Sequence, residues 1–296
     1  MTDSYMRGIE RARLWWMIDV APALETHVPD LYPYIAAGLV GDGSDCFGFD
    51  DETSMDHDTD TRVKIWMPMG MGNEYMSERI KAAIGSTTKG SVEVGEVPAF
   101  YEKYTGLEFS PANWREWLAI PQKNLAAATN GEVFYDGPGR FTSRRKTLLG
   151  YYPHEVCLKL LEGDVLAMGQ AGQYNYGRSL RRGENVAAAL AKATFMEHAL
   201  SAVFILNKTY MPFYKWAHRA VRPLPILGEY AWEALDAIAT ATDAVDRIEE
   251  FSEKIVEELH RAQLSSEPST FLVHHAHVLR EQIIEPELRE ENPWKL

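Results

Sequence analysis

The chain has 296 residues, of which 46% are hydrophobic and 11% aromatic, so it is expected to fold into one large or two smaller globular domains rather than remain disordered. Its 30 Lys and Arg residues against 43 Asp and Glu residues give a net charge of −13, which argues against general binding to nucleic acids or anionic membranes. The charge is uneven: residues 228–296 hold 16 acidic and 6 basic side chains, whereas residues 140–182 hold 8 basic and 3 acidic ones.

The sequence carries no sign of export. The two cysteines, Cys46 and Cys157, cannot crosslink a chain of this size and have no paired zinc spacing. No basic segment followed by an apolar stretch opens the chain. The most apolar window, residues 187–206, contains two charged residues and a histidine, which favours a buried amphipathic helix over a membrane span. We therefore expect a soluble, reduced, cytoplasmic protein that does not contact membranes.

Helices and strands are mixed in the first half of the chain. Hydrophobic spacing predicts helices over residues 4–25 and 74–84. Alternating or continuous apolar runs bounded by Gly, Pro and Asp predict strands over residues 34–40, 62–67, 91–97 and 131–136. A Gly- and Asp-rich loop extends from Gly41 to Asp60. This order is typical of an α+β or α/β domain.

The second half of the chain is predicted to be helical. Long helical patterns cover residues 153–176, 184–208, 213–221, 229–261 and 270–285, and Gly and Pro residues separate them. We place a domain boundary near Gly150, which gives one domain over residues 1–150 and another over residues 151–296. The expected fold is α+β, with a small mixed sheet followed by a helical bundle.

One loop has the residue pattern of a metal-dependent phosphoryl-transfer site. Gly43 and Ser44 follow a predicted strand, and Asp56 and Asp58 come shortly before the next one. If residues 55–67 begin that strand, side chains two positions apart point to the same face, so the two carboxylates project together. Such a pair suits two Mg²⁺ ions that hold a phosphoryl group. A Gly-Ser turn offers backbone N–H groups and a hydroxyl to a triphosphate.

A third carboxylate is needed to complete such a site. Glu93 lies between Val92 and Val94 on a predicted strand, so it points away from the core and can share the face of the two aspartates. Glu96 and Asp136 are the alternatives.

The loop GSDCFGFDDETSMDHD resembles the signature of the nucleotidyltransferase superfamily, which includes DNA polymerase beta and the aminoglycoside nucleotidyltransferases. Their pattern is Gly-Ser, about ten residues, Asp-x-Asp and then an acid on a later strand. The longer string is similar to an uncharacterised bacterial family within that superfamily, which continues with a Val-Glu-Val strand and a Pro-x-x-Lys-Trp motif. Here these are Val92–Val94 and Pro212–Trp216, so the resemblance covers roughly residues 30–225. The acidic cluster Asp50-Asp51-Glu52 departs from many members.

The resemblance implies a nucleotidyltransferase core, a helical domain and an active site in the cleft between them. It implies transfer of a nucleoside monophosphate from an NTP, with ATP favoured, to a hydroxyl acceptor, with release of pyrophosphate. Asp56, Asp58 and Glu93 are the expected catalytic and metal-binding residues, with two Mg²⁺ ions, and Glu93 can also accept the proton of the acceptor hydroxyl. Gly43 and Ser44 are expected to hold the phosphates.

Three basic residues are further candidates for phosphate binding. Arg178 and Arg182 lie four apart on a predicted helix, and the alternative is a solvated helix face. Lys215 lies in the first turn of a helix that Pro212 is expected to begin, where a cation is disfavoured unless an anion is nearby. Its alternative is a side chain that packs on Trp216 with its ammonium group in water.

The acceptor cannot be read from the sequence. A small molecule suits the acidic helical domain best, a protein side chain remains open, and a tRNA end is disfavoured by the net charge. A non-catalytic nucleotide-binding or toxin–antitoxin-type regulatory protein is the alternative function, and a metal-dependent phosphohydrolase is a third. The oligomeric state is not predicted.

Overall fold

The computed structural model describes residues 6–51, 61–85 and 90–295. The chain forms two compact units. Unit 1 comprises residues 1–112 and 120–150, and unit 2 comprises residues 113–119 and 151–296. The main division therefore falls between Gly150 and Tyr151, while the short segment 113–119 joins unit 2. The fold class is α+β, as the sequence predicts.

Unit 1 is built on a mixed four-stranded sheet in its described part. The strands lie in the order β3-β2-β1-β4, with bounds Gly90–Glu96, Thr61–Met67, Ala36–Leu39 and Glu132–Asp136. β1 runs antiparallel to β2 and β4, whereas β2 and β3 are parallel. Because Gly38 pairs with Lys64 in antiparallel register, the end of β1 lies beside the beginning of β2.

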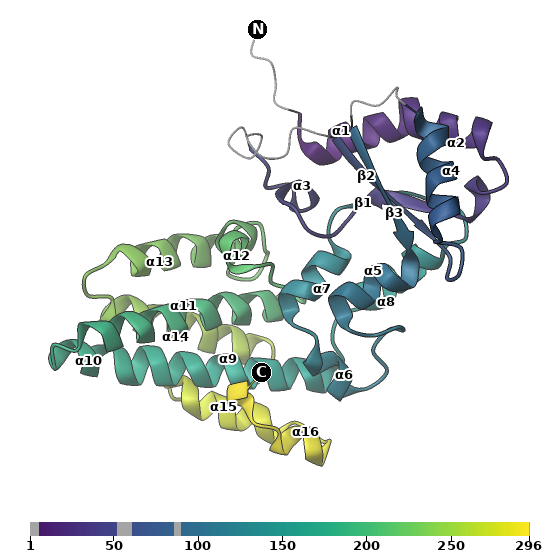
Figure 1. Ribbon diagram of the computed structural model, residues 1–296. Coiled ribbons are helices and arrows are strands. Elements are labelled where there is room, and N and C mark those ends of the chain that lie inside the picture. Colours follow the sequence, from purple (N-terminus) through teal and green to yellow (C-terminus); the bar gives the residue numbers. More distant parts are fainter. Residues whose placement is uncertain (1–5, 52–60, 86–89, 296) are drawn as a thin grey trace, which may run out of the picture. The chain divides into compact units, whose positions relative to one another are not determined.

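Helices cover both faces of this sheet (Figure 1). On one face, Val63 and Ile65 of β2 pack against α1 (Gly8–Trp15), the π-helical segment η1 (Trp16–Val20), α2 (Ala21–His27) and α4 (Glu74–Ile84). On the other face, Trp66 stacks on Phe141 at 4.1 Å between ring centroids and meets Phe100 edge-on. These aromatic rings come from α8 (Arg140–Leu149) and α5 (Val97–Thr105), next to α7 (Gln122–Thr129). Alternation along β2 thus divides its side chains between two packed layers.

Unit 2 contains only helices in its described residues. They are α6 Trp114–Ala119, α9 His154–Met168, the π-helical η5 Gly169–Tyr176, α10 Gly177–Arg181, α11 Asn185–Leu206, α12 Tyr214–Val221, α13 Gly228–Thr240, α14 Val245–Arg261, α15 Leu272–Glu281, α16 Pro286–Glu290 and the 3₁₀ turn Pro293–Lys295. Their core is a single apolar cluster that includes Val165, Phe195, Leu235, Phe251 and Leu279. α9, α11, α13, α14 and α15 each contribute to it, which makes the unit a helical bundle.

One helix among the described residues, α11, is long and apolar enough to cross a membrane. Its Phe195, Ala199 and Val203 are fully buried in the core of unit 2. Its Lys192 donates hydrogen bonds to the carbonyls of Ala239 and Ala241. A charged residue that binds a neighbouring helix end fits a core helix, so this feature is consistent with a soluble protein.

Three predicted helices differ from the structure. The helix expected over residues 229–261 is two helices, α13 and α14, separated at residues 241–244. The helix expected to begin at Pro212 begins at Tyr214, with Phe213 as its N-cap. The helix predicted over residues 153–176 is longer in the structure, because it continues through η5 and α10 to Arg181.

Candidate functional site

The segment Gly41–Ser44, which we call the Gly-Ser turn, connects β1 to the short helix α3 (Ser44–Phe47). Gly41 and Gly43 have φ values of 114° and 127°, which residues with a Cβ rarely adopt. A Cβ on Gly41 would lie 2.5 Å from Tyr104 Oη, and one on Gly43 would lie 2.3 Å from Asp45 Oδ1. Both glycines are therefore required by the shape of the turn and by its close neighbours.

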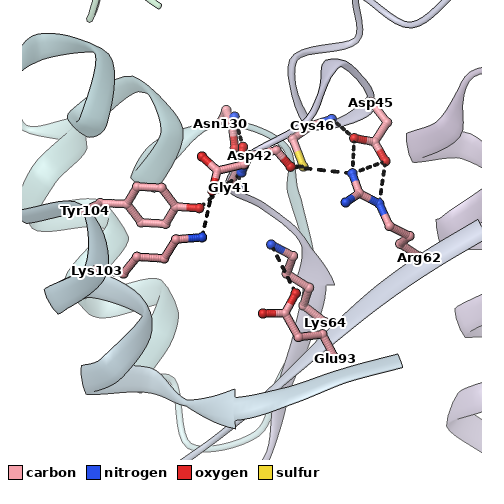
Figure 2. Close-up of polar contacts among 10 residues, drawn as sticks. All are labelled: Gly41, Asp42, Asp45, Cys46, Arg62, Lys64, Glu93, Lys103, Tyr104 and Asn130. Atoms are coloured by element: carbon pink, nitrogen blue, oxygen red, sulfur yellow. Dashed lines mark hydrogen bonds and ion pairs between the residues drawn. The ribbon is translucent and has the colours of Figure 1, made fainter. Parts of the chain in front are cut away.

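Side chains distant in sequence hold the Gly-Ser turn in place (Figure 2). Asn130 accepts a hydrogen bond from Gly41 N at 2.8 Å and donates one to Gly41 O at 2.7 Å. Tyr104 Oη accepts from Asp42 N at 3.1 Å. Arg145 in turn donates to the carbonyls of Asn130 and Gly131. The turn is fixed from α5, from the loop before β4 and, indirectly, from α8.

Arg62, at the beginning of β2, binds the residue that follows the Gly-Ser turn. Arg62 makes hydrogen bonds to both carboxylate oxygens of Asp45, with its Nη2 2.6 Å from Oδ1. Cys46 is buried and its thiol lies 3.5 Å from the carbonyl of Asp42. Burial, reinforced by the Asp45 charge, raises the pKa of the Cys46 thiol to about 12, so it is a packing residue and not a nucleophile.

Two backbone donors of the turn have no partner among the described residues. Gly43 and Ser44 are half-buried, and neither backbone N–H group donates a hydrogen bond to the described part of the chain. Their neighbours Gly41 and Asp42 are, in contrast, both engaged. Unpaired N–H groups in a rigid turn are suited to donate hydrogen bonds to an anionic oxygen of a ligand.

Three cations and three carboxylates surround the turn. Besides the Arg62–Asp45 pair, Lys103 Nζ lies 2.7 Å from Asp42 Oδ2, and Lys64 Nζ lies 3.6 Å from Glu93 Oε2. Although burial acts in the opposite direction, the hydrogen bond and charge of Lys103 hold the pKa of Asp42 below its usual value. Burial and the nearby Asp42 carboxylate raise the pKa of Tyr104. Asp42 is therefore ionised and Tyr104 neutral near neutral pH.

The register of the sheet separates the three candidates for a third acid. Glu93 lies opposite Lys64 at the middle of β3, where its carboxylate meets the Lys64 ammonium group, and 73% of its side chain is exposed. Glu96 lies at the other end of β3 and accepts a hydrogen bond from Gly72 N at 2.7 Å. Asp136 pairs with Ala36 at the beginning of β1 and accepts from Thr142 N. Of the three, Glu93 lies nearest to the turn in the register of the sheet.

The aspartate pair lies outside the described residues. Asp56 and Asp58 fall within residues 52–60, so their role remains a prediction. The strand they were expected to begin is described from Thr61, at the edge of the sheet where β1 ends. Among the described residues, no group of three or more His, Cys, Asp or Glu side chains is arranged to hold a metal ion. Of the three predicted metal ligands, Glu93 lies within the described residues. It is an exposed carboxylate, the kind of ligand that Mg²⁺ prefers.

The three other basic candidates belong to unit 2. Arg178 lies over the ring of Tyr174 at 4.6 Å, and Arg182 caps the C-terminal end of α10 rather than lying within a longer helix. Lys215 is exposed, and its Nζ lies 4.3 Å from the centre of the Trp216 ring. This contact favours the alternative that the sequence left open for Lys215, and phosphate binding by these residues remains a prediction.

Sequence patterns did not indicate several residues that form the turn's surroundings. These are Asp42, Asp45, Arg62, Lys64, Lys103, Tyr104, Asn130 and Arg145. Arg62 and Lys64 could have been found, because they share one face of the strand that follows the Asp-x-Asp pair. Tyr104 and Asn130 carry no such signal, since only the folded chain brings them to Gly41. In the basic segment 140–182, Arg144 and Arg145 donate hydrogen bonds to backbone carbonyls of unit 1.

The sequence pattern of one family, described as a domain of unknown function (DUF4037), matches residues 117–217. No curated protein and no solved structure is significantly similar to the chain. The matched region includes Asn130, Arg145 and Lys215 but not the Gly-Ser turn, β2 or the aspartate pair. Because the description of this family names no activity, the resemblance to nucleotidyltransferases remains a prediction.

Proposed function

We propose that the chain is a Mg²⁺-dependent nucleotidyltransferase that transfers a nucleoside monophosphate from an NTP to a hydroxyl group of a small molecule. The observation that carries this proposal is the Gly-Ser turn, held rigidly at the edge of the sheet with the N–H groups of Gly43 and Ser44 unpaired in the described chain. This turn adjoins the strand into which Asp56 and Asp58 lead and the side of the sheet that bears Glu93.

In the proposed reaction, the acceptor hydroxyl forms a bond to the α-phosphorus of the NTP, and the bond from that phosphorus to the bridging oxygen breaks. Pyrophosphate leaves with the bond's electrons, and the hydroxyl proton passes to a carboxylate such as Glu93. Asp56, Asp58 and Glu93 would hold Mg²⁺, which supplies charge neutralisation and alignment of the phosphates. Gly43 and Ser44 would bind the β- and γ-phosphates through backbone N–H groups. Catalysis would rest mainly on positioning and electrostatics.

The test is pyrophosphate release with each Mg-NTP, alone and with pooled small-molecule acceptors, in the wild type and in Asp58→Asn. We expect the wild type to release pyrophosphate and the variant to lose at least about tenfold in rate, equivalent to about 1.4 kcal/mol of barrier, because a neutral amide cannot replace a metal-binding carboxylate. Asp19→Asn, an identical change at an exposed position in unit 1, should leave the rate unchanged.

Other outcomes point to the alternative functions. Mg-NTP that raises the melting temperature of the wild type without any release indicates a nucleotide-binding regulator. Free phosphate as the product indicates a phosphohydrolase. A shift of the same size in the Asp56→Asn/Asp58→Asn double variant means that the nucleotide binds elsewhere and contradicts the proposed site.

A further inference from the structure

Lys64 is a buried cation with too few partners. Its side chain is 8% exposed, and its one ion pair among the described residues is with Glu93, at 3.6 Å. Its ammonium group makes no hydrogen bond within the described chain, although it carries three donors. Removing a charge from water without hydrogen bonds is unfavourable, so a stable protein normally satisfies such a group. Lys64 therefore has donors that a further acceptor, either water or a ligand oxygen, can engage.

The position of Lys64 indicates where that acceptor binds. Arg62 and Lys64 project from the same face of β2, and each lies against one glycine of the Gly-Ser turn. A Cβ on Gly43 would lie 2.4 Å from Arg62 Nη2, and one on Gly41 would lie 3.2 Å from Lys64 Nζ. Arg62 is bound to both oxygens of Asp45, whereas the ion pair of Lys64 within the described chain is its longer contact with Glu93 (Figure 2). Lys64 is thus the cation of this pair that a ligand at the turn can engage.

The contact between Lys64 and Glu93 can be replaced by a contact between Lys64 and another anion. Glu93 is mostly exposed, so water can replace its contact with Lys64 when the lysine turns to another anion. Asp42, the other carboxylate near Lys64, is held by Lys103 at 2.7 Å. A ligand oxygen at the turn would therefore meet one buried ammonium group without having to break a short ion pair.

We infer that Lys64 binds a phosphoryl oxygen of a ligand held at the Gly-Ser turn and gives up its contact with Glu93 when it does so. This deepens the proposed function, on which the identity of the ligand rests, by assigning a phosphate-binding residue that the sequence did not single out. The anion is bound by Lys64 and the backbone of the turn themselves, so its binding does not require a metal ion.

The test is calorimetric titration of the full chain with inorganic pyrophosphate in the presence of EDTA. We expect the wild type to bind and Lys64→Met, which keeps the length of the side chain and removes its charge, to bind at least tenfold more weakly. Glu93→Gln should bind at least as tightly as the wild type, because it frees Lys64 and removes a negative charge. Lys81→Met, which removes an exposed lysine paired with Glu78 on α4, should match the wild type.

Three contrary outcomes would overturn the role of Lys64, and each can be told apart from failure of the proposed function. Wild-type affinity in a folded Lys64→Met variant, or weaker binding in Glu93→Gln, overturns the role of Lys64; the second result applies even if Lys64→Met does not fold. Absence of metal-free pyrophosphate binding by the wild type also overturns it. The proposed nucleotidyltransferase function stands or falls separately, on binding of Mg-NTP and on pyrophosphate release by the same preparation.

Discussion

A single amide side chain joins two parts of unit 1 that are 89 positions apart in the sequence. Asn130 satisfies both backbone groups of Gly41, which is buried and has a positive φ. Because a buried backbone group without a partner destabilises the folded state, Asn130 acts on the Gly-Ser turn as a backbone strand would. The shape of the turn thus depends on a residue that lies outside the motif.

Replacement of Asn130 by Ala should lower the free energy of unfolding by about 1–3 kcal/mol, since it leaves the N–H and C=O groups of Gly41 unpaired. Urea denaturation measures the change. Asn175→Ala, at an exposed position, is the control and should alter stability by less than about 0.5 kcal/mol. If Asn130→Ala lowers the free energy of unfolding no more than the control does, the turn keeps its geometry without the Asn130 hydrogen bonds.

At the scale of elements, the break between α13 and α14 is stabilised by contacts from other helices and by Asp243, whose carboxylate accepts a hydrogen bond from Val245 N. The segment has neither Gly nor Pro, although Thr240, Thr242 and Asp243 are weaker helix formers than the alanines around them. Tyr176 accepts a hydrogen bond from Ala244 N at 3.1 Å, and Lys192 donates to the carbonyls of Ala239 and Ala241. These partners replace the backbone hydrogen bonds that a continuous helix would make across residues 241–244.

Tyr176→Phe should lower the stability of the chain by about 1–3 kcal/mol, because it removes the acceptor for a buried N–H group and leaves the ring in place. Chemical denaturation followed by circular dichroism provides the measurement. Tyr174→Phe makes the same change at an exposed ring and should have little effect. If the two variants are equally stable, the break does not depend on Tyr176.

At the scale of the whole molecule, the helical unit contains a titratable pair in its core. Asp164 of α9 is buried, and its Oδ1 accepts a hydrogen bond from His198 Nδ1 of α11 at 2.7 Å. Burial raises the pKa of Asp164. Burial alone would lower the pKa of His198, but the hydrogen bond and charge of Asp164 raise it above its usual value. In both cases the folded chain binds the proton more tightly than the unfolded chain does.

A folded-state pKa above the unfolded value gives stability at low pH that is lost as the pH rises through the folded pKa. We therefore expect the His198 contribution to be complete below its unfolded pKa of about 6.5 and to disappear above its raised folded pKa. Melting temperatures between pH 6 and pH 9 check this. His198→Gln keeps a donor for Asp164 without titrating, so the stability difference from the wild type should shrink as the pH rises. A difference that is constant or grows contradicts the pairing.

Much of the fold is determined by local sequence patterns. The strand at residues 61–67 alternates core and opposite-face residues, and the helix Glu74–Ile84 has the predicted bounds. Gly41 and Gly43 mark a turn that only glycine accommodates readily. These features follow from side-chain periodicity and backbone sterics, which a few consecutive residues specify.

The surroundings of the Gly-Ser turn and the division of the helical unit depend on tertiary structure. Nothing near Asn130 or Tyr104 in the sequence indicates that they bind Gly41 and Asp42, and nothing near Ala244 indicates that Tyr176 binds the N-terminal end of α14. Sheet register likewise decides that Glu93 lies nearer to the turn than Glu96 or Asp136 does. Each of these outcomes depends on contacts between distant segments. Local periodicity specifies which face a side chain occupies, but only the packed chain specifies what that face meets.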